Sequence, residues 1–133
     1  MKIISTKTHG FLDYLVGILL VISPALFNFS RGGAESWIPM IMGVSLLLMS
    51  ALTRYELSLF NLISMPVHLG FDIASAFLLT LSPFIFGFHS YIMMPHIIMG
   101  LILLSTALMT DPHPNHIPAK HAHTPKKIKK DLR

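Results

Sequence analysis

The sequence has no cysteine, a single tryptophan and few charged side chains. Without cysteine, the chain can form no disulfide framework and offers no thiolate nucleophile or thiolate metal ligand. Charged residues make up 12% of the chain, whereas a soluble globular domain carries about 25%. Apolar residues make up 53%, and the mean hydropathy is +0.65. This composition favours a small membrane protein over a soluble domain.

Four long apolar runs follow one another along the chain, each of 17 to 19 residues. A helix rises 1.5 Å per residue, so about 20 residues cross the ~30 Å hydrocarbon core of a bilayer. The first run lacks an A-x-A-like cleavage site and recurs inside the chain, so we do not expect a signal peptide. We predict an all-α fold, a four-transmembrane-helix bundle with spans near Phe11–Phe29, Trp37–Thr53, Phe71–Phe88 and Ile92–Met109.

An internal repeat organises these runs. Residues 9–29 read HGFLDYLVGILLVISPALFNF, and residues 68–88 read HLGFDIASAFLLTLSPFIFGF. Without a gap, the two segments share His9/His68, Asp13/Asp72, Ser23/Ser82 and Pro24/Pro83. The runs that follow match at a slightly shorter offset, which pairs Gly43 with Gly100, Ser50 with Ala107 and Thr53 with Thr110. We interpret the pattern as a tandem duplication of a helical hairpin, with repeats over about 8–53 and 67–110.

The basic residues are placed asymmetrically. Nine of the ten Lys and Arg residues fall on one side of a four-span arrangement, and only Arg31 falls on the other. The positive-inside rule then predicts that both termini are cytoplasmic. Two hairpins that leave and return to the same side have the same orientation, related by a pseudo-twofold axis along the membrane normal. Residues 1–110 form the membrane domain, and residues 111–133 form a His/Lys-rich cytoplasmic tail whose composition is typical of disorder.

The segments between the spans carry further signals. The connection over residues 54–66 mixes apolar and polar residues, which favours a short helix lying in the membrane interface. Aromatic residues fall near the predicted span ends, where they are expected to anchor the protein at the interface: Tyr14, Trp37, Tyr55 and Tyr91.

Asp13 and Asp72 are the only acidic residues within the predicted spans. An aspartate at the membrane centre costs about 2.5–3.5 kcal/mol on insertion scales, so it needs a partner or a function. His9 and His68 precede them at i,i+4 spacing and share their helix faces. Three interpretations stay open: structural pairs that hold the two hairpins together, ion or proton handling, and contact with a ligand or cofactor.

The Ser-Pro pairs lie further along the same helix faces. A proline within a helix frees the carbonyl four residues earlier, here that of Leu20 or Leu79. In lipid this carbonyl must be satisfied inside the bundle, so we expect Ser23 and Ser82, or water, to reach it. Helix kinks are expected at Pro24 and Pro83.

The remaining histidines lie outside the repeated stripe. His96, near the start of the fourth run, is expected to be a hydrogen-bonded interfacial residue, with haem ligation as the less favoured alternative. The tail histidines could bind a transition metal loosely, although they lack the geometry of a structural zinc site: His113, His116, His121 and His123. The tail lysines are expected to attract anionic lipid headgroups: Lys126, Lys127, Lys129 and Lys130. Nucleic-acid binding is not expected.

The repeated unit H-x3-D-x3-(G/A)-x2-L-x2-S-P-x2-F resembles the SPW repeat, a family of small bacterial membrane proteins. The matching positions are Asp13, Gly17, Ser23 and Pro24, with Asp72, Ser82 and Pro83 in the second copy. Ala25 and Phe84 stand where the signature has tryptophan, so the chain resembles a divergent member. His9 and His68 stand where an aromatic residue is expected. The resemblance implies the fold and a bacterial inner-membrane location, and it implies no activity.

No nucleophile–base pair, phosphate-binding loop or catalytic metal motif is found in the sequence, so we do not predict an enzyme or a cofactor. We predict a non-enzymatic membrane scaffold or accessory protein with structural His-Asp pairs. The alternative is a proton or cation channel or carrier that uses Asp13 and Asp72. Such a small bundle buries little beyond its own seams, so we expect a homo-oligomer.

Overall fold

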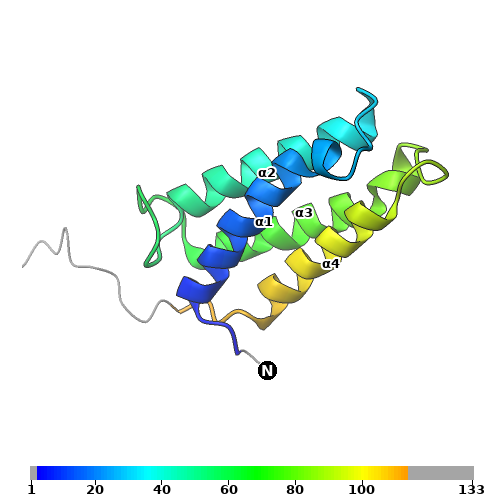
Figure 1. The fold of residues 1–133 in the computed structure, drawn as a ribbon. Helices are drawn as coiled ribbons and strands as arrows, with labels where there is room; N and C mark the ends of the chain where they lie inside the picture. The colour runs from blue at the N-terminus through cyan, green and yellow to red at the C-terminus, as the bar shows by residue number, and fades with distance from the viewer. Residues whose placement is uncertain (1–2, 114–133) are drawn as a thin grey trace, which may run out of the picture.

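The computed structural model describes residues 3–113, and this part of the chain is all-α (Figure 1). It holds four helices: α1 (Thr6–Leu26), α2 (Ala34–Leu52), α3 (Met65–Ile85) and α4 (Met94–Met109). Ser5 caps α1 by accepting a hydrogen bond from the Thr8 amide at 3.2 Å. Pro66 and Pro95 lie in the first turns of α3 and α4, where a missing backbone donor costs nothing.

The helices form two hairpins that pack side by side (Figure 1). α1 packs mainly against α2, and α3 mainly against α4, while α2–α3 and α1–α4 contacts join the hairpins. The two hairpin turns lie at one end of the bundle. The α2–α3 connection and both ends of the described chain lie at the other end, called here the chain-end side.

Small residues set the close approach within each hairpin. A Cβ added to Gly43 would lie 2.6 Å from the Gly17 carbonyl oxygen, so the backbones of α1 and α2 nearly touch. A Cβ added to Gly100 would lie 2.9 Å from the carbonyl oxygen of Ala76, so α3 and α4 meet in the same way. Small residues at such positions are typical of helix packing in membranes, where close backbone contact drives association.

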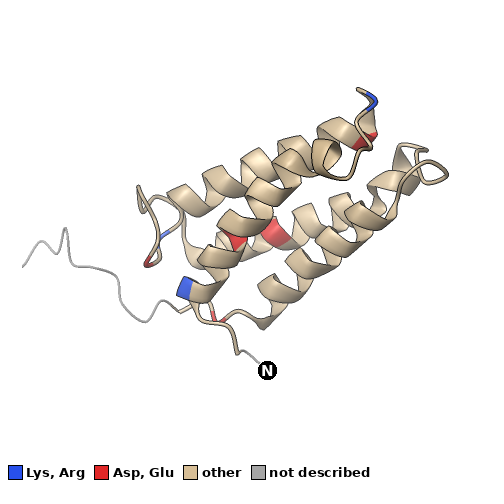
Figure 2. Ribbon diagram, viewed as in Figure 1, with Lys and Arg blue, Asp and Glu red and all other residues tan. Residues whose placement is uncertain are grey.

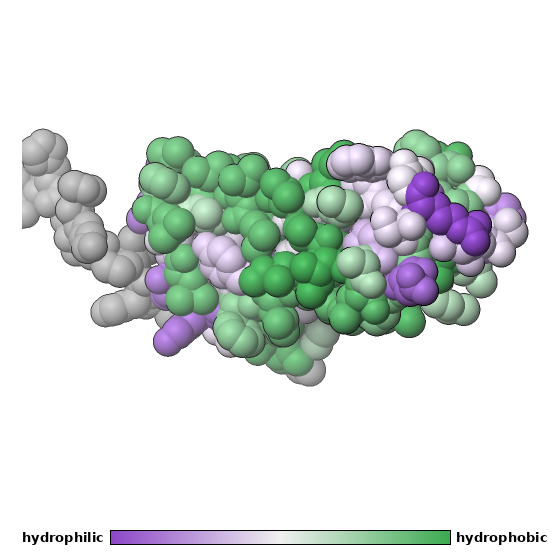
Figure 3. Space-filling view, turned by 45° about the horizontal axis from the view of Figure 1, so that its top comes forward, coloured by the Kyte–Doolittle hydropathy of each residue, from purple (hydrophilic) through white to green (hydrophobic). Residues whose placement is uncertain are grey.

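The outer surface is apolar over most of its length. Three helices, α1, α2 and α3, are long and apolar enough to cross a membrane, and α4 is a shorter apolar helix of 16 residues. On α1 an exposed stripe runs along one face: Phe11, Leu15, Ile18 and Ile22. Figure 3 shows the apolar surface covering the middle of the molecule, with polar residues gathered toward the ends. This surface matches a lipid environment, and the protein is a membrane protein.

Short backbone contacts tie each hairpin to the other on the chain-end side. Before α1, the Ile4 amide donates to the Met109 carbonyl at 3.0 Å, and the Ile4 carbonyl accepts from Asp111 at 3.0 Å. Before α3, the Ile63 amide donates to the Leu52 carbonyl at 2.9 Å, and the Ile63 carbonyl accepts from Arg54 at 2.7 Å. The prediction of an interfacial helix over 54–66 is wrong, because no helix lies between α2 and α3 in the described part of the chain. The Ile63 backbone bonds to Leu52 and Arg54 at the end of α2 instead of within a helix of its own.

Candidate functional site

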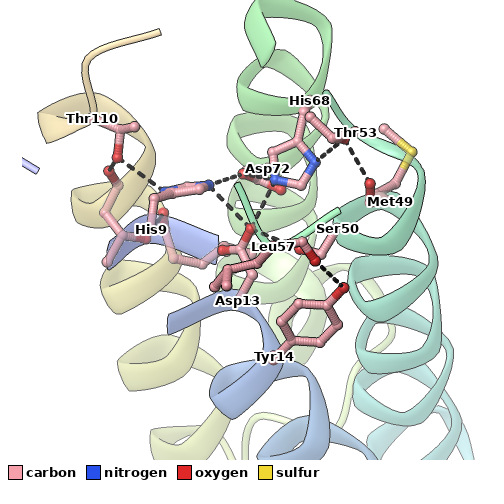
Figure 4. A network of polar contacts seen from close by, with 12 residues as sticks. His9, Asp13, Tyr14, Met49, Ser50, Thr53, Leu57, His68, Asp72 and Thr110 are labelled. Carbon is pink, nitrogen blue, oxygen red and sulfur yellow. Dashed lines mark hydrogen bonds and ion pairs between the residues drawn. The ribbon is translucent and has the colours of Figure 1, made fainter. Parts of the chain in front are cut away.

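Four side chains from α1 and α3 meet inside the bundle and form what we call the quartet: His9, Asp13, His68 and Asp72 (Figure 4). Within each helix, Nε2 of the histidine lies near Oδ2 of the aspartate four residues later, at 3.1 Å in α1 and 3.2 Å in α3. Between the helices, Nε2 of His68 lies 2.7 Å from Oδ2 of Asp13, and Nε2 of His9 lies 3.1 Å from Oδ2 of Asp72. Nε2 of each histidine therefore faces two carboxylates.

The quartet is enclosed on all sides. Its side chains are 0–1% exposed, and the acidic positions of α1 and α3 lie close together along the ribbon (Figure 2). The prediction that the two polar helix faces meet is confirmed by the cross-helix contacts. Burying charged groups without partners would cost several kcal/mol per ion, so the mutual pairing is what makes this burial tolerable.

Two threonines orient the imidazole rings. Thr53 Oγ1 lies 2.9 Å from Nδ1 of His68, and Thr110 Oγ1 lies 3.0 Å from Nδ1 of His9. Each hydroxyl also donates to the carbonyl four residues earlier, at 2.6 Å in both cases. A hydroxyl carries one proton, so each threonine must accept from the histidine, and Nδ1 carries a hydrogen. These threonines end α2 and α4 and thereby link both partner helices to the quartet.

This arrangement determines what each Nε2 faces. With Nδ1 occupied by a hydrogen, Nε2 of a neutral imidazole carries a lone pair, and that lone pair points at carboxylate oxygens, which are also acceptors. Attraction between Nε2 and Oδ2 therefore requires a proton, carried by the imidazole or by the carboxyl group, or a metal cation between them.

The two halves of the quartet differ in one contact. Ser50 of α2 donates a hydrogen bond to Oδ2 of Asp13 at 3.0 Å. At the position of α4 that matches Ser50 in the repeat alignment stands Ala107, which is buried and offers Asp72 no hydroxyl. The other carboxylate oxygens, Oδ1 of Asp13 and Oδ1 of Asp72, are buried and have no hydrogen-bond partner within the described residues.

The Ser-Pro pairs satisfy backbone groups away from the quartet. Ser23 donates to the Leu20 carbonyl at 2.9 Å, and Ser82 donates to the Leu79 carbonyl at 2.8 Å. These are the carbonyls that the prolines free, so the serine before each proline supplies the missing donor. Pro24 lies two residues before the end of α1, and Pro83 has the same place in α3.

A second polar group lies at the hairpin-turn end. The Glu35 carboxylate accepts from the amides of Arg31 and Gly33, and it is 7% exposed. His96 is 1% exposed and its Nε2 lies 3.0 Å from the Glu35 carbonyl, which links α4 to the start of α2. Sequence reasoning missed Glu35, because its partners are backbone amides of a turn that no side-chain pattern reveals.

Tyr55 does not occupy the interfacial position expected of it. It is 2% exposed and its ring lies over Gly10, so closely that an added Cβ would collide with it. Its ring also lies beside that of His68, with centroids 6.5 Å apart. Burial raises the pKa of the Tyr55 phenol above its ordinary value, so the side chain stays neutral. The absent Cβ at Gly10 explains why this aromatic residue packs inward instead of toward the headgroups.

His113, the tail histidine that the structure describes, takes no part in the quartet. His113 is exposed and its Nδ1 lies 2.8 Å from Asp111 Oδ1. The other predicted tail residues lie outside the described part of the chain: His116, His121, His123, Lys126, Lys127, Lys129 and Lys130.

The apolar helices around a buried polar centre define a small helical membrane protein. The SPW repeat domain matches residues 7–110, a segment that contains the whole quartet. The chain belongs to the SPW repeat family, as its Ser-Pro units indicated. No curated protein and no solved structure matches the chain.

Proposed function

We propose that this protein is a non-enzymatic scaffold or accessory protein of the bacterial inner membrane, whose two hairpins are joined by the quartet. The observation that carries the proposal is the cross-helix pairing of His9 with Asp72 and of His68 with Asp13, with every member at most 1% exposed. Breaking a buried charged pair by removing one partner typically costs about 3–5 kcal/mol, so the pairing favours one arrangement of the hairpins.

The proposed architecture is four spans made of two parallel repeats with both termini cytoplasmic. Equivalent hydrogen bonds support the duplication, since the Ile4–Met109 and Ile63–Leu52 contacts occupy matching positions of the two copies. The Thr53–His68 and Thr110–His9 contacts match in the same way. The sequence assigns nine of the ten basic residues to one side of a four-span scheme, and by the positive-inside rule this asymmetry supports the cytoplasmic termini.

The apolar packing around the quartet favours a scaffold over a conducting protein. Toward the hairpin turns, the bundle is filled by buried apolar side chains: Val16, Leu20, Leu46, Ala76, Leu79, Met99 and Leu103. On the chain-end side, a second buried group covers the quartet: Tyr55, Met65, Leu69 and Ala107. An ion moving along the bundle axis would have to shed its water against both apolar groups.

The scaffold proposal is tested with purified protein in liposomes that contain a pH-sensitive dye. We expect proton and monovalent-cation flux equal to that of empty liposomes, with an added ionophore as the positive control. Flux in the wild type that disappears in Asp13→Asn/Asp72→Asn would overturn the scaffold and favour the channel or carrier. The expected homo-oligomer is tested by light scattering of the protein in detergent, and a monomer would contradict it.

A further inference from the structure

We propose that the quartet is a binding site for a divalent transition-metal ion of the zinc class, with two imidazole and two carboxylate ligands. The ligand atoms would be Nε2 of His9 and His68 together with Oδ2 of Asp13 and Asp72. This inference deepens the scaffold proposal, because a bound ion would join α1 to α3 at the point where the two hairpins meet.

The spacing of the four ligand atoms suits a tetrahedral ion. The four Nε2–Oδ2 separations are 2.7, 3.1, 3.1 and 3.2 Å. Zinc bonds of about 2.0–2.1 Å imply edges of roughly 3.3 Å between ligands of a regular tetrahedron. One ligand atom from each residue can be chosen so that all four lie within 4.8 Å of one another. A complete tetrahedral shell also requires side-chain rotations that bring the two nitrogens, and the two oxygens, to the same separation of roughly 3.3 Å.

The hydrogen bonds aim the imidazoles in the way that a metal requires. Because Thr53 and Thr110 accept from Nδ1–H, each Nε2 that loses its proton directs its lone pair into the quartet. Metal-bound histidines almost always donate their other ring N–H to an oxygen, which fixes the tautomer and the ring orientation. The two threonines supply this second set of contacts for both rings.

Charge balance also favours a divalent ion. Two carboxylates carry a charge of −2, so one M²⁺ ion with two neutral imidazoles makes the buried site neutral. Two protons on the imidazoles achieve the same balance, so binding of one ion to that form releases two protons. A neutral site matters here, since net charge is expensive inside a bundle surrounded by lipid.

The carboxylates retain capacity that the present contacts do not use. Oδ1 of Asp13 and Oδ1 of Asp72 are buried and have no hydrogen-bond partner among the described residues. Each Oδ1 could bind the ion as a second oxygen ligand from its carboxylate. The donor set of nitrogen and oxygen without sulfur suits zinc and its neighbours and does not favour Cu(I). Four protein ligands without an open position are typical of a structural site.

The test uses the full chain in detergent, with the tail histidines replaced so that they cannot contribute: His113→Asn, His116→Asn, His121→Asn and His123→Asn. After removal of metal with a chelator, Co²⁺ is titrated as a spectroscopic probe, because tetrahedral Co²⁺ has strong visible absorption. We expect one equivalent of Co²⁺ with the tetrahedral spectrum, displaced by Zn²⁺. Absence of this spectrum in the folded protein would overturn the proposal.

Variants locate the ion within the chain. Asp13→Asn/Asp72→Asn should abolish the tetrahedral spectrum, and persistence of the same spectrum and stoichiometry would overturn the proposal. If the double asparagine variant does not fold, the Thr53→Val/Thr110→Val variant is used instead, because it keeps all four ligand side chains. We expect it to bind about 10–100-fold more weakly, the usual effect of losing these outer contacts, and unchanged affinity would contradict the site.

The metal-site proposal and the scaffold proposal can be refuted independently. The thermal stability of the metal-free protein tests only whether the quartet joins the two hairpins, because no ion is present in that measurement. Equal unfolding temperatures of the metal-free wild type and Asp13→Asn/Asp72→Asn would overturn the scaffold proposal, whatever the Co²⁺ spectrum shows.

Discussion

Replacement of Asp13 by asparagine should destabilise the metal-free protein more than any single lipid-facing substitution. Asp13 Oδ2 faces Nε2 of His68 at 2.7 Å and Nε2 of His9 at 3.1 Å, and it accepts from Ser50 at 3.0 Å. Losing one partner of a buried charged pair costs about 3–5 kcal/mol, and a single neutral hydrogen bond contributes about 1 kcal/mol. We therefore expect Asp13→Asn to lower the free energy of unfolding by about 3–5 kcal/mol.

The assay is equilibrium unfolding of the metal-free chain in mixed detergent, followed by circular dichroism. Ser50→Ala removes only one contact of the same carboxylate, and Ala107 shows that the matching half of the quartet does without it, so we expect a loss of about 1 kcal/mol. Asp111→Asn, at an exposed acid outside the helices that contacts His113, serves as the control for the change of side chain. If Asp13→Asn lowers the free energy of unfolding no more than Asp111→Asn does, the claim that the quartet holds the two hairpins together is refuted.

Three further predictions follow from the packing. Gly43→Ala should destabilise the protein by about 1–3 kcal/mol in the same unfolding assay, because its Cβ would meet the backbone of α1. An unchanged unfolding midpoint would show that α1 and α2 can move apart without loss of stability. Gly10→Ala should cost a similar amount by overpacking against Tyr55, and Tyr55→Leu should restore most of it; failure of that rescue would place the cause elsewhere. Ser23→Ala should cost about 1 kcal/mol by leaving the Leu20 carbonyl without its side-chain donor, whereas no change would indicate that water replaces the hydroxyl.

The helices and the meeting of the two polar faces could be predicted from the sequence. The i,i+4 spacing of each His-Asp pair and the exact recurrence of that pair in the second copy require polar faces that point inward in lipid. The serine donors to Leu20 and Leu79 followed from the same logic, since a proline leaves a defined carbonyl to be satisfied.

The cross-pairing and the outer contacts could not be predicted in this way. Nε2 of His68 lies closer to Asp13 than to Asp72, the aspartate of its own helix, and this preference depends on the separation of α1 and α3, which no spacing within one helix determines. The roles of Thr53 and Thr110 depend on the exact residue at which α2 and α4 end. The inward position of Tyr55 depends on the absent side chain of Gly10 in a different helix.

The central claim is that the imidazole of one repeat pairs with the carboxylate of the other inside the bilayer. Solid-state NMR of the labelled protein in lipid bilayers can measure the proximity of His68 Nε2 to the Asp13 carboxyl carbon directly. We predict a dipolar correlation between these two atoms, matched by one between His9 Nε2 and Asp72, and both lost when the aspartates become leucine. Correlations confined to the pairs within each helix, with none between α1 and α3, would contradict the account.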